Sequence, residues 1–131
     1  MNTTSRILGE ASKVRPPTEK ELTDPRSAYD YARDVIGGQF PEGEPAIATN
    51  SFTALYYAKD VIKGRFPEAE ATIAKSPQWA YYYAVNVIKG RFPEAEPAIA
   101  KSPDYSTMYL KQFPQAKLEW AMNGLIDWLD L

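Results

Sequence analysis

The stretch VIKGRFPEAEPAIAKSP at residues 87–103 has a near-copy, VIKGRFPEAEATIAKSP, at residues 61–77. A looser third copy, VIGGQFPEGEPAIATNS, occupies residues 35–51, so the copies begin 26 residues apart. A fixed period of this length is typical of proteins in which one small supersecondary unit is used several times. The repeat therefore indicates the architecture before any chemistry is considered.

Each copy predicts a long helix, a tight turn and a short helix. In the third repeat the pair Ser76-Pro77 is a start signal, because serine caps free backbone N–H groups and proline suits the first helical position. The long helix should have about 13 residues. Gly90 is expected to form its left-handed C-terminal cap. The pair Phe92-Pro93 then starts a second helix of about 8 residues.

One such hairpin cannot bury its apolar stripe alone, but successive hairpins can bury theirs against one another. The sequence therefore predicts an all-α fold in which short helical hairpins stack as a small solenoid. The predicted single domain covers residues 18–131. Its repeats lie at about residues 24–49, 50–75, 76–101 and, in degenerate form, 102–117, and a capping helix covers residues 118–131.

The two ends of the sequence depart from the repeat. Residues 1–17 show little periodicity and are predicted to form a flexible arm. In the TEKEL sequence that follows, a capping box is expected, with Thr18 capping the third residue and Glu21 reaching back. The predicted capping helix should bury one apolar face, flanked by Trp120 and Trp128. That face consists of Leu118, Ala121, Met122, Leu125 and Leu129.

The composition excludes several classes of site. The 131 residues are 44% apolar and 24% charged, with a formal net charge of −2, so no charge excess indicates nucleic acid or an anionic membrane. Cysteine and histidine are both absent, which removes thiol nucleophiles, Cys/His zinc sites and imidazole acid–base chemistry. No apolar run approaches the roughly 20 residues that span a bilayer, and the polar start does not resemble a signal peptide. We expect a cytoplasmic protein that is not an enzyme and uses no cofactor.

The phrase YAKDVIKGRFPEAEATIAKSP at residues 57–77, with its sibling at 83–103, resembles a short helical repeat of largely uncharacterised proteins from tailed phages and large DNA viruses. The resemblance covers residues 27–103 and implies an α-helical repeat fold and a phage or mobile-element origin. It implies little about activity. Within VIKGRFPEAE the first repeat departs from the motif at three positions, Gly37, Gln39 and Gly43.

Basic residues at the ends of the long helices form one candidate site: Lys63, Arg65, Lys89 and Arg91. In a stack with layers about 10 Å apart they would line one edge, where they could contact phosphates or acidic protein surfaces. The alternative, which we favour, is that they compensate helix dipoles and pair with nearby glutamates. Those glutamates are explained by their own place in the first turn of the short helices; they are Glu68, Glu70, Glu94 and Glu96.

Aromatic residues form a second candidate site near the start of each long helix. One tyrosine recurs at the same position of every repeat and is expected to pack between layers: Tyr31, Tyr57, Tyr83 and Tyr109. Consecutive helical residues diverge by about 100°, so their aromatic neighbours cannot all face inward. Partial exposure is expected among Tyr56, Tyr81 and Tyr82, together with Trp79. Exposed tyrosine and tryptophan side chains are favoured anchors of protein interfaces, although simple packing is an equal alternative.

Three functions follow from these features. The favoured one is a non-catalytic protein-binding module, and the resemblance suggests inhibition of a host protein, such as a CRISPR-type defence complex, by occupation of its surface. The alternatives are nucleic-acid binding along the basic edge, with tyrosines stacking on bases, and sequestration of a small nucleotide ligand. No catalytic, cofactor-binding or metal-binding residue is predicted. The candidate partner-binding residues are Trp79, Tyr81, Tyr82, Tyr56, Lys63, Arg65, Lys89 and Arg91.

Overall fold

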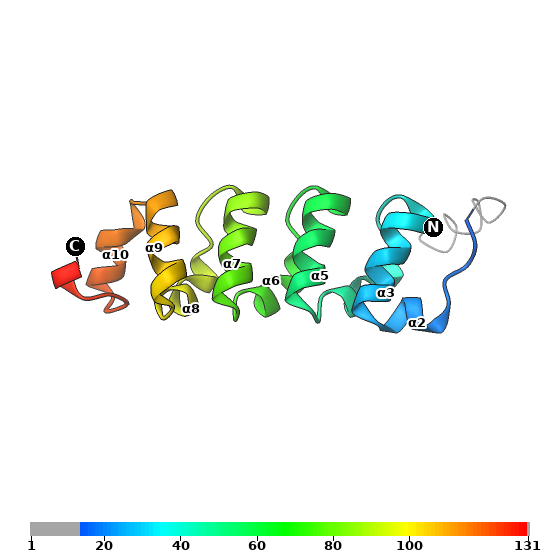
Figure 1. Cartoon of the computed structure of the whole chain (residues 1–131), viewed down its shortest axis with the longest axis horizontal. Helices are drawn as coiled ribbons and strands as arrows, with labels where there is room; N and C mark the ends of the chain where they lie inside the picture. Colours follow the sequence, from blue (N-terminus) through cyan, green and yellow to red (C-terminus); the bar gives the residue numbers. More distant parts are fainter. Residues whose placement is uncertain (1–13, 131) are drawn as a thin grey trace. The chain divides into compact units, whose positions relative to one another are not determined.

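The computed structural model describes residues 14–130, and every regular element in this range is helical (Figure 1). The all-α prediction is therefore confirmed. The chain divides into two compact parts, Met1–Glu70 and Ala71–Leu131, which we call the N-terminal and C-terminal modules. Within the described range, no helix is both long enough and apolar enough to cross a membrane.

The N-terminal module begins with the predicted capping box. Helix α2 (Glu19–Thr23) starts where Thr18 accepts a hydrogen bond from the backbone N–H of Glu21 at 3.1 Å. The Glu21 carboxylate in turn accepts a hydrogen bond from the backbone N–H of Thr18 at 2.9 Å. This reciprocal pairing satisfies two of the N–H groups that a helix start leaves free, so the prediction is confirmed.

The segment before α2 is held more firmly than expected. The guanidinium group of Arg15 donates two hydrogen bonds to the Glu21 carboxylate, at 2.8 and 2.6 Å. These bonds are the main reason that the pKa of Glu21 is lowered to about 2. The backbone carbonyl of Arg15 also accepts a hydrogen bond from the hydroxyl group of Tyr31. These contacts involve the described end of the flexible arm predicted over residues 1–17, which stays a prediction; residues 1–13 lie outside the described range.

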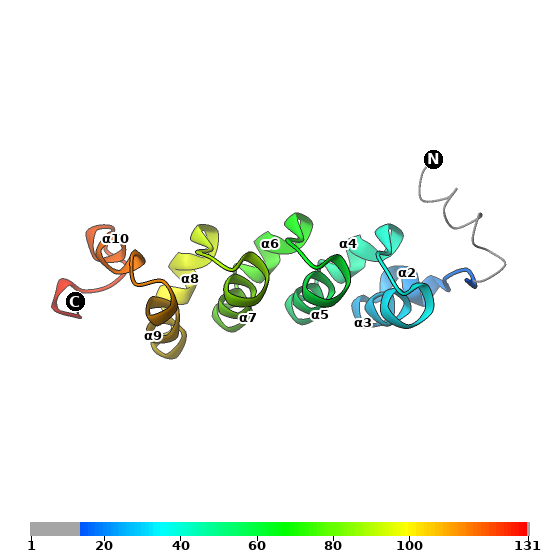
Figure 2. The same ribbon diagram turned by 90° about the horizontal axis from the view of Figure 1, so that it is seen from above.

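Two long helices and a short one follow in the N-terminal module. Each long helix starts at a capping side chain: Asp24 accepts from the backbone of Ser27 at 2.9 Å, and Asn50 accepts from that of Thr53 at 3.0 Å. Helix α4 packs against α3, and α3 lies beside α5 (Figure 2). The elements are α3 (Pro25–Asp30), η1 (Tyr31–Ile36), η2 (Pro41–Gly43), α4 (Glu44–Ile47), α5 (Ser51–Tyr56), η3 (Tyr57–Ile62) and the start of α6 (Pro67–Ile73).

The C-terminal module contains the third repeat in its expected form. The long helix covers residues 77–88 and the short helix residues 93–100, close to the predicted lengths. Helix α8 packs against both α7 and α9, which also contact each other. The elements after α6 are α7 (Pro77–Tyr83), η4 (Ala84–Ile88), η5 (Pro93–Ala95), α8 (Glu96–Ala100), α9 (Pro103–Gln112), α10 (Ala116–Met122) and η6 (Trp128–Asp130).

The long helices end one residue earlier than expected. Lys89 takes the left-handed conformation at φ 59°, so the prediction that Gly90 forms this cap is wrong. The last part of the helix is a π-helical turn, in which the N–H of Lys89 bonds to the carbonyl of Ala84, five residues back, at 2.7 Å. Lys63 has the same conformation, at φ 61°, and the first repeat has Gly37 there, at φ 73°. Glycine suits this position because, without a Cβ atom, it adopts a positive φ angle without strain.

A second glycine of the first repeat is required by close packing. A Cβ atom on Gly43 would lie 2.4 Å from Cε2 of Phe40, inside van der Waals contact. The later repeats have Ala69 and Ala95 at this position. The departure from the motif at Gly43 therefore reflects the position of the Phe40 ring.

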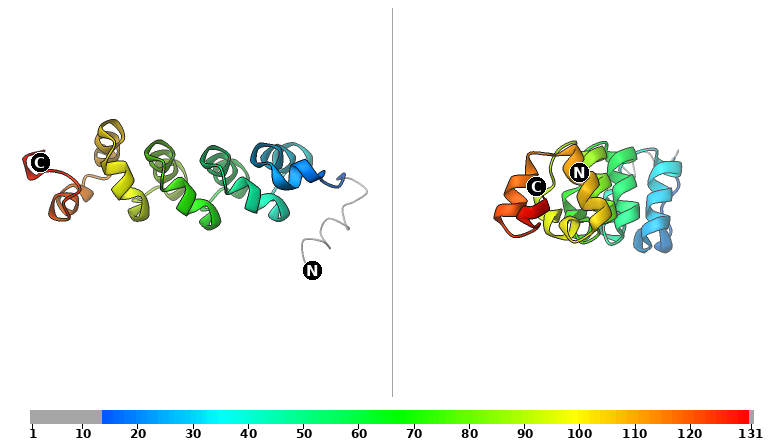
Figure 3. Two further views of the ribbon diagram at one scale, coloured as in Figure 1. Left: turned by 90° about the horizontal axis from the view of Figure 1, so that it is seen from below. Right: turned by 60° about the vertical axis from the view of Figure 1, so that its left-hand side comes forward.

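The capping helix differs from the prediction in both length and orientation. Helix α10 ends at Met122, and Gly124, at φ 76°, starts an irregular segment that leads to η6 (Figure 3). Trp120 and Ala121 are buried, together with Ala116. The predicted apolar face is mostly exposed, since Leu118 is 54%, Met122 67% and Leu129 91% exposed. The predicted buried face was wrong because the Trp120 side chain, rather than the leucine side chains, packs and hydrogen-bonds inside the module.

The partners of Trp120 belong to a buried polar cluster centred on Glu96. This carboxylate, 5% exposed, accepts two hydrogen bonds from Arg91 (2.8 and 2.7 Å), one from the indole N–H of Trp120 (2.9 Å) and one from the hydroxyl of Tyr109. Burial would raise the pKa of Glu96, but these hydrogen bonds hold it below its ordinary value. The expectation that helix dipoles alone explain the glutamates is therefore wrong for Glu96, and Glu70 is buried as well.

The four tyrosines that share one position in the repeats are all buried, as predicted. None has more than 1% of its surface exposed. Each also contacts a phenylalanine of the FP motif or of its degenerate copy, with ring centroids 4.7–5.3 Å apart. These residues are Tyr31, Tyr57, Tyr83 and Tyr109.

Candidate protein-binding surface

The outer face of α7 carries the aromatic residues that the sequence singles out. Ser76 caps the helix by accepting a hydrogen bond from the backbone N–H of Trp79 at 3.4 Å, and Pro77 occupies the first turn. This start places Trp79 and Tyr82 one helical turn apart on the same face. Both side chains are half-buried, as expected, whereas Tyr81 points inward and is only 7% exposed. The expectation that some of these aromatic residues are partly exposed is therefore confirmed, and Tyr81 is the buried one.

Helix α9 extends this face with two further residues. The Tyr105 ring lies 6.3 Å from that of Tyr82, edge to face, and 6.0 Å from that of the buried Tyr81. The Trp79 and Tyr82 rings are 6.2 Å apart. Met108 is 37% exposed and lies one turn after Tyr105. We call the half-buried or exposed residues Trp79, Tyr82, Tyr105 and Met108 the aromatic patch.

The surroundings of the aromatic patch carry little charge. Residues 77–88 contain no lysine, arginine, aspartate or glutamate, and the exposed polar side chains on this helix are Gln78 and Asn86. The nearest acid on α9 is Asp104, which is exposed. Partial burial, the neighbouring Tyr82 and Asp104 together raise the pKa of Tyr105. The Tyr105 hydroxyl is therefore neutral at physiological pH, and Tyr82 is its hydrogen-bonding neighbour.

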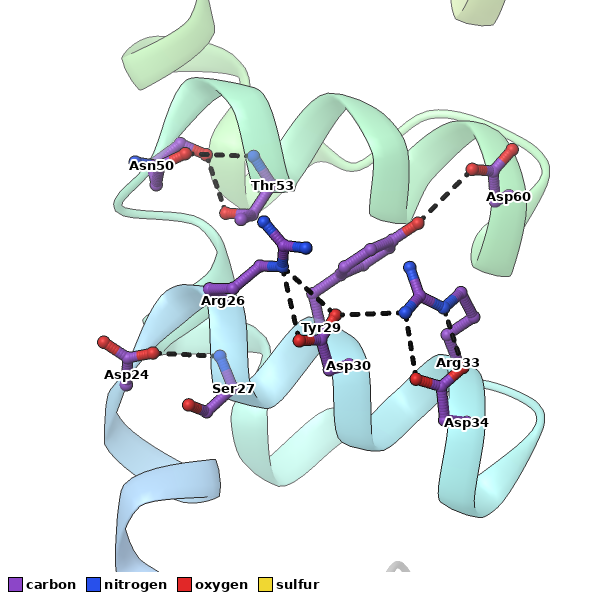
Figure 4. A network of polar contacts seen from close by, with 10 residues as sticks. All are labelled: Asp24, Arg26, Ser27, Tyr29, Asp30, Arg33, Asp34, Asn50, Thr53 and Asp60. Atoms are coloured by element: carbon purple, nitrogen blue, oxygen red, sulfur yellow. Dashed lines mark hydrogen bonds and ion pairs between the residues drawn. The ribbon is translucent and has the colours of Figure 1, made fainter.

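The matching face of the first long helix, in the N-terminal module, is strongly charged (Figure 4). Asp30, which stands where α7 has Tyr82, pairs with Arg26 at 3.2 Å and with Arg33 at 3.3 Å. Arg33 also pairs with Asp34 at 2.8 Å, and the hydroxyl of Tyr29 hydrogen-bonds to a carboxylate of the next long helix at 3.4 Å. These charges satisfy one another, which is typical of a solvated helix face. The aromatic patch is thus a departure from the repeat.

Tyr56, the remaining aromatic candidate, belongs to the N-terminal module. It is half-buried, as expected, and its ring lies 4.9 Å from that of Phe52, which is 41% exposed. The ammonium group of Lys59 lies 5.5 Å from the centre of the Tyr56 ring. Tyr56 therefore already has a cation beside it, in contrast to Tyr82 at the same repeat position.

The basic candidates divide into paired arginines and exposed lysines. Arg65 donates two hydrogen bonds to Glu70, both at 2.8 Å. Arg91 pairs with Glu96 and also contacts Glu119 at 2.5 Å. Pairing with nearby glutamates, the favoured alternative, is therefore confirmed for both arginines. The two lysines, Lys63 and Lys89, are exposed at the left-handed ends of the long helices.

Two members of the aromatic patch were not selected from the sequence. Tyr105 and Met108 follow Trp79 and Tyr82 by one repeat of 26 residues. Placing the degenerate fourth copy in register would therefore have put all four residues on adjacent helices. The roles of the eight candidate residues toward a partner stay predictions.

The described part of the chain has no grouping of acidic residues that could hold a metal ion. A groove of about 760 Å³ lies beside α9 in the C-terminal module, lined by Leu110, Leu125 and Ile126 among others. Its lining also includes polar and charged side chains, so the groove remains the place where the alternative of a small ligand would be tested; they are Ser106, Thr107, Lys111, Lys117 and Asp127.

Comparison with protein-family models, with curated proteins and with solved structures gives no match, so the function of this chain must be inferred from its own residues.

Proposed function

We propose that this chain is a non-catalytic protein-binding module that holds its partner through the aromatic patch. The observation that carries the proposal is a cluster of four large side chains on α7 and α9, next to a helix of residues 77–88 that has no charged side chain. The cores of protein interfaces are depleted in charge and enriched in tyrosine, tryptophan and methionine. Such residues also dominate binding energy, because they bury much area while losing little side-chain entropy.

We further propose that the helical hairpins stack in chain order as a small solenoid. Within each module, a buried tyrosine of one repeat hydrogen-bonds to a glutamate of the repeat before it: Tyr57 to Glu44 at 2.6 Å, and Tyr109 to Glu96 at 2.5 Å. Nearest-neighbour contacts of this kind are what hold solenoids together. Small-angle scattering tests this part: an elongated particle is expected, and a spherical one would contradict it.

Protein is favoured over nucleic acid as the partner because of how the basic residues are used. Arg65 and Arg91 are engaged by carboxylates, which offset the positive field that phosphate groups would need. Of the two candidate lysines, Lys63 belongs to the N-terminal module and Lys89 to the C-terminal module, so neither module presents both. The resemblance to phage repeats narrows the proposal further, to a host protein such as a CRISPR-type defence complex in the host cytoplasm.

The test uses the full chain and two matched variants. Affinity purification from extract of the native cell, followed by reconstitution with the purified partner, gives a dissociation constant for each protein. We expect Tyr82→Ala to weaken binding at least about tenfold, as for an interface anchor. The control is Met122→Ala, which removes a large and more exposed apolar side chain on α10 and should change binding less than about twofold. Circular dichroism checks that both variants are folded.

Three outcomes would contradict the proposal. In the first, no partner binds in a defined ratio. In the second, Tyr82→Ala binds as tightly as the wild type. In the third, the chain binds an oligonucleotide with strong salt dependence, and Lys63→Glu with Lys89→Glu abolishes this binding; the alternative nucleic-acid function would then be supported.

A further inference from the structure

Two tyrosines of the long helices in the N-terminal module, one buried and one half-buried, have a cation of their own helix beside the ring. The guanidinium carbon of Arg33 lies 5.0 Å from the ring centroid of Tyr29, and the ammonium nitrogen of Lys59 lies 5.5 Å from that of Tyr56. A cation within about 6 Å of an aromatic ring face is attracted by the negative charge of the π system. In the N-terminal module, each of these two rings therefore already has a basic side chain of the same protein against it.

The third repeat keeps the rings but lacks the cation. Tyr81 corresponds to Tyr29, two repeats earlier, and Tyr82 corresponds to Tyr56, one repeat earlier. The position that holds Arg33 and Lys59 in the first two repeats holds Val85 in the third. Over residues 14–130, no lysine or arginine lies over the ring of Tyr81, Tyr82 or Tyr105.

The charge around the aromatic patch would favour a cation from outside. Residues 77–88 have no basic side chain to repel one, and Asp104 is an exposed acid beside Tyr105. The closest lysines in sequence are Lys111, which is exposed three residues after Met108 near the end of α9, and Lys75 and Lys101, which precede the starts of α7 and α9.

We infer that the aromatic patch accepts a basic side chain of the protein partner, an arginine in preference to a lysine, against the rings of Tyr82 and Tyr105. It takes the place that Arg33 and Lys59 fill in the N-terminal module. Arginine is preferred because its guanidinium group is flat, is weakly hydrated and stacks on aromatic faces. This inference rests on the proposed function and states the chemistry of the partner at that site.

Nuclear magnetic resonance of the full chain with labelled tyrosine rings tests the inference directly. The probe is N-acetyl-arginine methylamide, and the control probe is N-acetyl-citrulline methylamide, which has nearly the same shape but no charge. We expect arginine to shift the ring signals of Tyr82 and Tyr105 at least about threefold more than citrulline, because only the cation gains from the ring faces. Equal shifts from the two probes would overturn the inference, as would larger shifts from N-acetyl-aspartate methylamide.

A substitution that restores the missing cation gives the second arm. Val85→Arg puts a guanidinium group where Arg33 and Lys59 occur, and Val85→Gln adds a comparable length without charge. We expect Val85→Arg to reduce the arginine-induced shifts at least about threefold, while Val85→Gln retains them. Undiminished shifts in Val85→Arg, shown to be folded by circular dichroism, would contradict the inference.

The same variants separate this inference from the proposed function. If Tyr82→Ala abolishes partner binding but Val85→Arg leaves it unchanged, the patch binds protein without a basic side chain, and only the inference fails. If neither substitution changes partner binding, both proposals fail.

Discussion

The hydroxyl group of Tyr109 donates a hydrogen bond of 2.5 Å to Glu96, thirteen residues earlier in the chain. The same hydroxyl accepts a hydrogen bond from the backbone N–H of Phe92 at 2.8 Å. In the N-terminal module, Tyr57 makes the equivalent contacts with Glu44 and with the backbone of Phe40. One buried hydroxyl thus donates to a carboxylate and accepts from the backbone N–H of a turn.

Removal of this hydroxyl should be costly. We expect Tyr109→Phe to lower the free energy of unfolding by about 1–3 kcal/mol, because the Phe92 N–H and the Glu96 carboxylate each lose a buried partner. Urea denaturation measures the change. The matched control is Tyr105→Phe on the aromatic patch, for which the cost should be below about 0.5 kcal/mol. Equal costs for the two variants would show that the hydrogen bonds to Tyr109 do not stabilise the fold.

Stability should depend on pH through Glu96. Its pKa lies below the ordinary value of 4.5 in the folded state, so the folded protein binds this proton less readily than the unfolded chain. Its contribution is therefore complete above pH 4.5 and is lost as the pH falls through the lower folded-state pKa. We expect the difference in unfolding free energy between wild type and Glu96→Gln to shrink from about pH 7 to about pH 3. A difference that stays constant or grows would contradict this assignment.

The left-handed lysines predict a stabilising substitution. Lys89→Gly should raise the free energy of unfolding by up to about 1 kcal/mol, since a side chain is disfavoured at φ 59°. The reverse substitution at the equivalent position, Gly37→Lys, should lower it by a similar amount. Thermal unfolding of the two variants tests both directions. A loss of stability in Lys89→Gly would mean that the lysine side chain makes contacts that outweigh the backbone strain.

The packing of Gly43 predicts a steric effect. Gly43→Ala should destabilise the protein by about 1–3 kcal/mol, because the new methyl group would overlap the Phe40 ring. Gly38→Ala is the control, since a Cβ atom there has no neighbour within 4 Å, and we expect little change. Chemical denaturation compares them. If both variants unfold at the same denaturant concentration, the ring moves aside at little cost.

Local signals predicted most of the helix starts. Thr18 and Glu21 form their capping box, and Ser76 caps its helix, because these contacts involve residues only three positions apart. The helix ends were less predictable. Gly90 is a usual cap residue, but the π-helical turn in η4 ends the helix at Lys89 instead. Nothing in the i, i+3, i+4 spacing distinguishes a π-helical turn from an α-helical one.

The errors at the C-terminal end and at the glutamates have a common cause. The spacing of Leu118 and Met122 indicates an apolar helical face, yet Trp120 is the buried residue because its indole N–H reaches Glu96. Burial of Glu96 depends on the same long-range contact. A pattern within one helix cannot show which of its faces meets a partner from another repeat, so these features required the structure. The aromatic patch was partly predictable, since Trp79 and Tyr82 were chosen from helical geometry alone.

The lysine at the end of the degenerate FPQAK sequence limits where a further repeat could be added to this protein. The sequence FPEAE ends at Glu96, whereas its degenerate counterpart, FPQAK, ends at Lys117, which offers no carboxylate to a further tyrosine. The tyrosine of an extra hairpin joined after α10 would therefore have no glutamate carboxylate to accept its hydrogen bond. A duplicate of residues 76–101 inserted after Lys101 would bring both halves of the bond and should be tolerated. An added repeat is thus expected to be tolerated between existing repeats but not next to Lys117.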